Sequence, residues 1–168
     1  MGKNDMGPSC LSYTVIRDSR EKQGQGWWFA KGQTCHGTVI RRLKTGDYTL
    51  EVFEDKFCIE RKGSIKEFAS NLIQDRFYNE LGRMSKMDFA VVLCEFDYSD
   101  MMTWPHFPGL SREEKSTIDS RLSRWYLLQR TWELTIEFPS ISFIYAGRWG
   151  QEAAASLFKR VAEKYGKG

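Results

Sequence analysis

The segment GDYTLEVFEDKFCIERK, residues 46–62, predicts a β-hairpin around which the rest of the chain can be placed. Its two arms, Tyr48–Phe53 and Lys56–Lys62, are rich in the aromatic and β-branched residues that strands favour. The charged pair Glu54-Asp55 between the arms suits a tight turn. The segment therefore predicts two paired strands within a sheet.

An even-numbered loop centred on Glu54-Asp55 fixes the cross-strand partners. They are the pairs Phe53–Lys56, Glu51–Cys58, Thr49–Glu60 and Asp47–Lys62. Because side chains alternate with period two along a strand, Asp47, Glu60 and Lys62 then project from one face. An odd-numbered loop or a bulge would send Asp47 to the opposite face.

Two carboxylates and an ammonium on one face are suited to metal-assisted hydrolysis of a phosphodiester. Carboxylate oxygens bind hard cations such as Mg2+. The cation stabilises charge on the phosphate and helps to generate a hydroxide nucleophile. Lys62 could orient the attacking water or neutralise the developing anion. A surface hairpin with a salt-bridged charged face is the alternative interpretation of the same pattern.

Two further motifs on either side of the hairpin strengthen the nuclease interpretation. A short β-branched strand, Tyr13–Ile16, runs directly into acidic and basic residues. In chain order the motifs are Asp18-x-Arg20-Glu21, Gly46-Asp47-Tyr48 and Glu60-Arg61-Lys62. Together they resemble the nuclease domain of the XPF-type structure-specific endonucleases, whose signature is a D-x-R-E strand end, G-D and E-R-K. The resemblance covers residues 13–94, including Arg76-Phe77 and Glu80-Leu81.

This resemblance implies a fold, an activity and a set of site residues. The fold is the PD-(D/E)XK, restriction-endonuclease-like core, an α/β fold with a mixed central β-sheet flanked by helices. The activity is metal-dependent DNA endonuclease, acting on branched or distorted duplex DNA. Asp47, Glu60 and Asp18 would bind Mg2+ or Mn2+, and Lys62 would assist the water. Glu21, Arg20 and Arg61 would complete the catalytic pocket.

The sequence also departs from the family pattern. The family commonly has an aspartate four residues after the lysine of E-R-K, where this chain has Lys66, followed by Glu67. The tandem helix-hairpin-helix module of many members has no room here. Two rival functions stay open: a catalytically silent DNA-binding or scaffolding module, and a restriction-type or junction-resolving nuclease with the same core.

Candidate DNA contacts are few. Arg76 and Arg83 lie seven residues apart and share a helix face, where they could contact phosphates, although a solvated face explains Arg83 equally well. Arg41, Arg42 and Lys44 form a small basic cluster. Because the net charge is only +3, we expect a homodimer or a partner protein to supply further DNA contacts. A helix carrying Trp125 and Trp132, or the last helix, offers an apolar surface for it.

Length and composition bound the remaining possibilities. The chain has 168 residues, 41% of them hydrophobic, which predicts a flexible leader over 1–12 and a single domain over 13–168. Four widely spaced cysteines without a C-x-x-C pair indicate reduced thiols rather than a disulfide framework or zinc site. No apolar run reaches membrane-spanning length and no signal peptide is present, so a cytoplasmic protein is expected.

The other predicted elements follow from apolar periodicity. We expect the order strand, hairpin, helix, strand, helix, strand, helix. The helices begin at a Ser64/Glu67 capping box, at a Ser111/Glu114 capping box that opens a long helix, and at Gln151. The strands after the hairpin cover 89–96 and 140–145. Trp27-Trp28-Phe29 lies in a loop, where it could stack on bases or cover one edge of the core.

Overall fold

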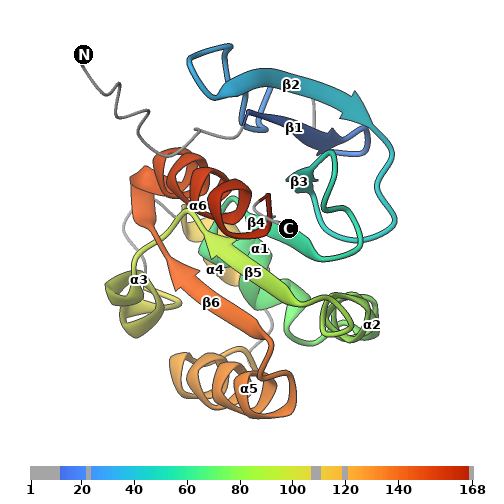
Figure 1. Cartoon of the computed structure of the whole chain (residues 1–168). Coiled ribbons are helices and arrows are strands. Elements are labelled where there is room, and N and C mark those ends of the chain that lie inside the picture. Colours follow the sequence, from blue (N-terminus) through green and yellow to red (C-terminus); the bar gives the residue numbers. More distant parts are fainter. Residues whose placement is uncertain (1–11, 22–23, 107–110, 119–120, 167–168) are drawn as a thin grey trace, which may run out of the picture.

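The centre of the fold is a six-stranded mixed β-sheet in the order β2-β1-β3-β4-β5-β6 (Figure 1). The structure is a computed structural model that describes residues 12–21, 24–106, 111–118 and 121–166. The strands are β1 Tyr13–Asp18, β2 Cys35–Arg41, β3 Tyr48–Leu50, β4 Phe57–Lys62, β5 Phe89–Cys94 and β6 Ile141–Tyr145. β3 runs antiparallel to both of its neighbours, and the other pairs are parallel. The predicted α/β fold with a mixed sheet is confirmed.

Helices cover both faces of this sheet (Figure 1). They are α1 Ile65–Asn71, α2 Asp75–Met84, α3 Tyr98–Thr103, α4 Arg112–Ser116, α5 Arg124–Glu137, α6 Gly150–Tyr165 and a short 3-10 turn, η1, at Gly147–Trp149. One apolar core joins α6 to the sheet, and the other joins α1, α2, α3 and α5 to its opposite face. The sheet therefore separates two cores.

The alternation along β4 decides where the functional side chains point. Phe57 and Ile59 belong to the core under α6, whereas Cys58 belongs to the core under α1 and α2. By the same alternation Arg61 faces the α6 side, while Glu60 and Lys62 face α1 and α2. One strand end thus delivers charged groups to two different environments.

The hairpin has a register different from the predicted one. Tyr48 pairs with Ile59, which is a shift of two residues, and β3 ends at Leu50 instead of Phe53. After Leu50 the chain turns, with the Phe53 N–H donating to the Leu50 carbonyl at 2.9 Å, and Phe53 is buried against Tyr165 of α6, with ring centroids 5.8 Å apart. Because the shift is even, it preserves which side chains share a face, and Asp47 stays on the side of Glu60.

Two predicted helices were wrong in extent, and one predicted capping box is only half formed. The single helix predicted between the hairpin and the strand 89–96 is two helices, since the chain turns where the Gln74 N–H donates to the Asn71 carbonyl at 2.9 Å. At its start Ser64 caps Glu67, but the Glu67 carboxylate accepts from Gly63, so the capping box is only half formed. The long helix predicted after Ser111 is divided into α4, which has the predicted capping box, and α5.

β2, α3 and the η1 turn were absent from the prediction. β2 is an edge strand with Val39 and Ile40 exposed, so it lacks a clean apolar alternation. α3 lies within the predicted loop after β5 and begins with an Asp97/Asp100 capping box. The predicted leader lies outside the described residues except for residue 12. In the part of the chain that the structure describes, no helix has the length and apolar character needed to cross a membrane.

Candidate active site

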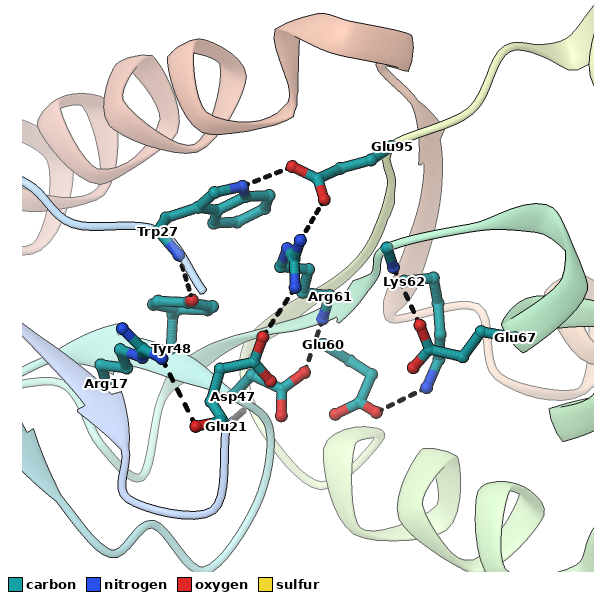
Figure 2. A network of polar contacts seen from close by, with 11 residues as sticks. Arg17, Glu21, Trp27, Asp47, Tyr48, Glu60, Arg61, Lys62, Glu67 and Glu95 are labelled. Carbon is teal, nitrogen blue, oxygen red and sulfur yellow. Dashed lines mark hydrogen bonds and ion pairs between the residues drawn. The ribbon is translucent and has the colours of Figure 1, made fainter. Parts of the chain in front are cut away.

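An open cavity of about 740 Å3 lies where β1, the Gly46-Asp47 turn and the end of β4 meet α1 and α2. It is lined by every predicted catalytic residue and by Arg76: Asp18, Arg20, Glu21, Asp47, Glu60, Arg61, Lys62 and Arg76. Segments far apart in the sequence therefore bring the three predicted motifs to one place, as Figure 2 shows for most of these residues.

Asp47 is held between two strands by its backbone. Its N–H donates to the Ile59 carbonyl of β4, and its carbonyl accepts from the Asp18 N–H of β1, both at 2.8 Å. The preceding Gly46 has a φ of +73°, and a Cβ there would lie 2.8 Å from the Cβ of Cys58. Only glycine fits this turn without strain. The carboxylate of Asp47 is thus fixed, with its Oδ2 accepting from the Arg61 N–H at 2.8 Å.

The surroundings of Asp47 disfavour its negative charge. Burial raises the pKa of Asp47 well above its ordinary value, and the nearby carboxylates of Glu60 and Glu21 raise it further. The Arg61 backbone N–H and the Lys62 ammonium oppose this rise without cancelling it. A further positive charge between these carboxylates would be favourable.

Glu60 and Lys62 form a buried ion pair on the same wall of the cavity (Figure 2). The Lys62 Nζ donates to Glu60 Oε1 at 2.8 Å and to Asn71 Oδ1 at 2.6 Å, and it lies 4.7 Å from the centroid of the Phe77 ring. Burial raises the pKa of Glu60. Burial by itself disfavours the ammonium, but the carboxylates of Glu60, Glu67 and Asp47 together outweigh it, so the pKa of Lys62 is raised. Lys62 stays charged.

Arg61 points to the other side of the sheet, where it is clamped between two acids. Its guanidinium is ion-paired with Glu21 at 2.7 Å and with Glu95, and it lies 5.4 Å from the Trp27 ring centroid. Trp27 Nε1 donates to the other oxygen of Glu95 at 2.6 Å, and the Trp27 ring stacks on Tyr48 (Figure 2). This network fixes Glu21 at the cavity.

The Asp18 carboxylate is occupied by hydrogen bonds from Arg20 and Leu43. Its two oxygens accept hydrogen bonds from the backbone and guanidinium of Arg20 and from the Leu43 N–H. Burial works against the charge of Asp18, but these hydrogen bonds together outweigh it and lower the pKa. A metal would have to displace Arg20 to reach this carboxylate. The role of Asp18 as a ligand stays a prediction.

Most of the predicted DNA contacts lie outside the cavity. Arg76 lines it, whereas Arg83 pairs with Glu80 and Arg41 pairs with Glu54. Arg42 and Lys44 are exposed on the loop before Asp47. Lys66, at the place of the family aspartate, is also outside the cavity and lies 3.6 Å from Glu114 of α4. Among the described residues, no three Asp, Glu, His or Cys side chains are grouped so that they could hold a metal ion.

Four residues that were not predicted as site residues support the site. Asn71 holds Lys62, the Glu80 carboxylate accepts the Gly46 N–H at 2.9 Å, and Glu95 and Trp27 hold Arg61. Two of them left a signal: Glu80 belongs to the Glu80-Leu81 stretch of the resemblance, and Glu95 is a charged residue directly after the apolar strand β5. Of the aromatic triplet in the loop, Trp27 and Phe29 are buried, which confirms a core role for them, and Trp28 is 54% exposed.

Comparisons with known proteins agree with this geometry. A model of the ERCC4 domain matches residues 17–150. Two solved structures are similar in fold: XPF from Aeropyrum pernix, with a TM-score of 0.58, and XPF from Aeropyrum pernix in complex with DNA, with a TM-score of 0.57. In each comparison the sequence identity is 17%, and the match covers 90% of this chain and 66% of the other. A search of curated proteins gives no significant match.

Proposed function

The chain belongs to the ERCC4 domain family, and from this membership and the site geometry we propose that it is a metal-dependent DNA endonuclease. The resemblance identified from three short motifs is thereby confirmed at the level of the family and the fold. The observation that carries the proposal is that Asp47, Glu60 and Lys62 line one cavity, where the Glu60 carboxylate is close enough to raise the pKa of Asp47.

A divalent cation fits the residues present. The Arg61 backbone N–H is hydrogen-bonded to one oxygen of Asp47, and the Lys62 ammonium is hydrogen-bonded to one oxygen of Glu60. Each carboxylate therefore keeps an oxygen for a ligand bond. Mg2+ is typically bound by one or two carboxylates together with waters and substrate phosphates, so a three-acid cluster is not required. Mg2+ or Mn2+ bound by Asp47 and Glu60 would stabilise charge on the phosphate and lower the pKa of a bound water.

The protein's own side chains supply the rest. The Lys62 ammonium makes two hydrogen bonds within the wall, which leaves one N–H to stabilise negative charge on a phosphate or to orient a water. Arg20 and Arg76, both exposed at the cavity, can contact backbone phosphates on either side of the cleaved bond. The charge of Arg61 is neutralised by Glu21 and Glu95, so the role of Arg61 is to hold Glu21 in place at the cavity.

We propose DNA, in branched or distorted duplex form, as the substrate. Support comes from family membership and from the similar fold of a protein whose structure was solved in complex with DNA. This chain spans 66% of that protein, and because its net charge is only +3 we expect further DNA contacts to come from outside this chain. A second copy or a partner protein is the proposed source, and α5 offers an apolar face on which Trp125 and Trp132 are 58% and 61% exposed.

A catalytically silent module is the rival from another class. The complete set of Asp47, Glu60 and Lys62, held in one cavity, favours catalysis over this rival. A junction-resolving nuclease would use the same residues, so substrate choice has to separate it from an enzyme that cuts flaps.

The test is cleavage of matched end-labelled linear, flap and four-way DNA in Mg2+, in Mn2+ and in chelator. We expect a branched substrate to be cut in either metal and none to be cut in chelator. Cleavage confined to the four-way substrate would favour the junction-resolving alternative. Tight DNA binding without cleavage under any of these conditions would favour the silent module and refute the proposal.

A further inference from the structure

The position of the Lys62 ammonium depends on a contact with a residue outside the three sequence motifs. Its side chain is 5% exposed, and its ammonium is enclosed by the Glu60 carboxylate, the Asn71 side-chain carbonyl and the Phe77 ring. Glu60 is two residues away on the same strand, whereas Asn71 and Phe77 come from α1 and α2. Contacts from α1 and α2 therefore fix the position of the Lys62 ammonium.

Asn71 is itself held firmly. It is the last residue of α1, and its backbone carbonyl accepts the Gln74 N–H that turns the chain into α2. On either side of it Phe68 and Leu72 are buried in the core beneath the sheet. The Asn71 amide lines the cavity, so its carbonyl can hold an ammonium at a fixed place in the wall.

The contact with Glu60 cannot fix the ammonium alone. A lysine has four flexible methylenes, and a single hydrogen bond to a residue on the same strand leaves the end of the chain free to pivot. Glu60 is also a proposed metal ligand, so its oxygens are shared with any bound cation. The Asn71 carbonyl is a neutral acceptor that competes with neither role.

We propose that Asn71 is a positioning residue for Lys62, which keeps the ammonium in the cavity wall where it can meet a phosphate oxygen or the attacking water. This inference rests on the proposed endonuclease function, and it names a residue on which the rate of that reaction depends. Asn71 acts through Lys62 and does not need to touch the reacting atoms itself.

The test compares Asn71→Leu, which keeps the size but lacks the acceptor, with Asn71→Asp, which keeps the acceptor. In single-turnover and steady-state cleavage, Asn71→Leu should lower kcat by roughly 10- to 100-fold with KM little changed, as for a misplaced catalytic group. Asn71→Asp should recover part of that loss. Asn71→Ala removes the acceptor with a smaller side chain and gives the same test if Asn71→Leu does not fold.

A second measurement is independent of activity. In 15N-labelled protein, a hydrogen-bonded lysine ammonium gives a sharp NH3+ signal, which Lys62→Arg would assign. The signal should broaden or vanish in Asn71→Leu and persist in Asn71→Asp. The matched control is Gln74→Leu, which changes another amide of the same cavity wall, and there the signal should persist.

The outcomes are distinct. An unchanged kcat or an unchanged ammonium signal in Asn71→Leu overturns the positioning role. Loss of the signal in Gln74→Leu as well overturns it too, because the effect would not be specific to Asn71. A wild-type protein that cleaves no DNA overturns the proposed function, while the ammonium signal still decides whether Asn71 positions Lys62.

Discussion

Replacing Lys62 by methionine tests the buried ion pair that holds the cavity wall together. Methionine keeps an unbranched apolar chain but removes the charge and the hydrogen bonds to Glu60 and Asn71. The two ionic side chains are 5% and 13% exposed, so solvent cannot readily replace the lost partner of Glu60. Glu60 would be left as a buried carboxylate facing Asp47, which already repels it.

Removing one partner of a buried pair costs about 3 to 5 kcal/mol. We expect Lys62→Met to lower the free energy of unfolding by this amount at neutral pH in chelator, which corresponds to a fall in Tm of roughly 10 °C for a chain of this size. Glu60→Gln should cost less, since Lys62 keeps its bond to Asn71 and Asp47 loses a repulsive neighbour.

The double variant completes a cycle that isolates the pair. Urea unfolding followed by tryptophan fluorescence, with chelator present, gives the four free energies. In the double variant, Lys62→Met with Glu60→Gln, the loss of unfolding free energy should be smaller than the sum of the two single losses, by about 2 kcal/mol or more. Single effects that add to within about 0.5 kcal/mol would show that the two side chains are not coupled, and would refute the reasoning.

Three other predictions concern charge at the site. Burial and neighbouring carboxylates raise the pKa of Asp47 in the folded protein. Protonated Asp47 therefore stabilises the fold fully below its ordinary pKa of 3.8, and this stabilisation is lost as pH rises through the folded-state pKa. In chelator, Asp47→Asn should therefore gain stability over the wild type as pH rises, and a pH-independent difference in urea titrations would contradict this. Lys62→Ala should slow cleavage by ~100- to 1000-fold without changing Mg2+ affinity measured by titration, and a loss of metal binding would disprove the assigned role. Arg76→Ala should reduce the salt slope of DNA affinity by ~0.9, whereas Arg83→Ala should reduce it less because Arg83 is paired with Glu80; equal slopes would remove Arg76 from the DNA surface.

The sequence was sufficient to predict that Asp47, Glu60 and Lys62 lie together, and they line one cavity at the end of β4. Period-two alternation put Glu60 and Lys62 on one face, and Asp47 stayed on that side because the register error was an even number of residues. The two-residue shift was not predicted: Phe53, which was assigned to the strand, lies beyond the end of β3 and packs against Tyr165, more than a hundred residues away. Local propensity says nothing of such a contact.

The supporting residues were beyond sequence reasoning for the same reason. Asn71 is an ordinary polar residue at the end of a short helix, and its importance comes from where α1 sits against β4. The predicted long helix after Ser111 failed because Leu122 turns into the core, where its carbonyl accepts the Trp104 Nε1–H at 2.8 Å. Tertiary packing overrode helical periodicity there. The extent of the domain and the role of Asp18 stay predictions.

The central claim is that Asp47 takes part in metal-dependent DNA cleavage, and a paired assay of wild type and Asp47→Asn tests it most directly. Cleavage of a labelled branched duplex is followed in Mg2+ and in chelator, and binding of the same DNA is measured on the same samples. The account predicts that the wild type cuts only in Mg2+, and that Asp47→Asn binds the DNA equally well but does not cut it. Cleavage by Asp47→Asn at the wild-type rate, or by the wild type in excess chelator, would contradict it.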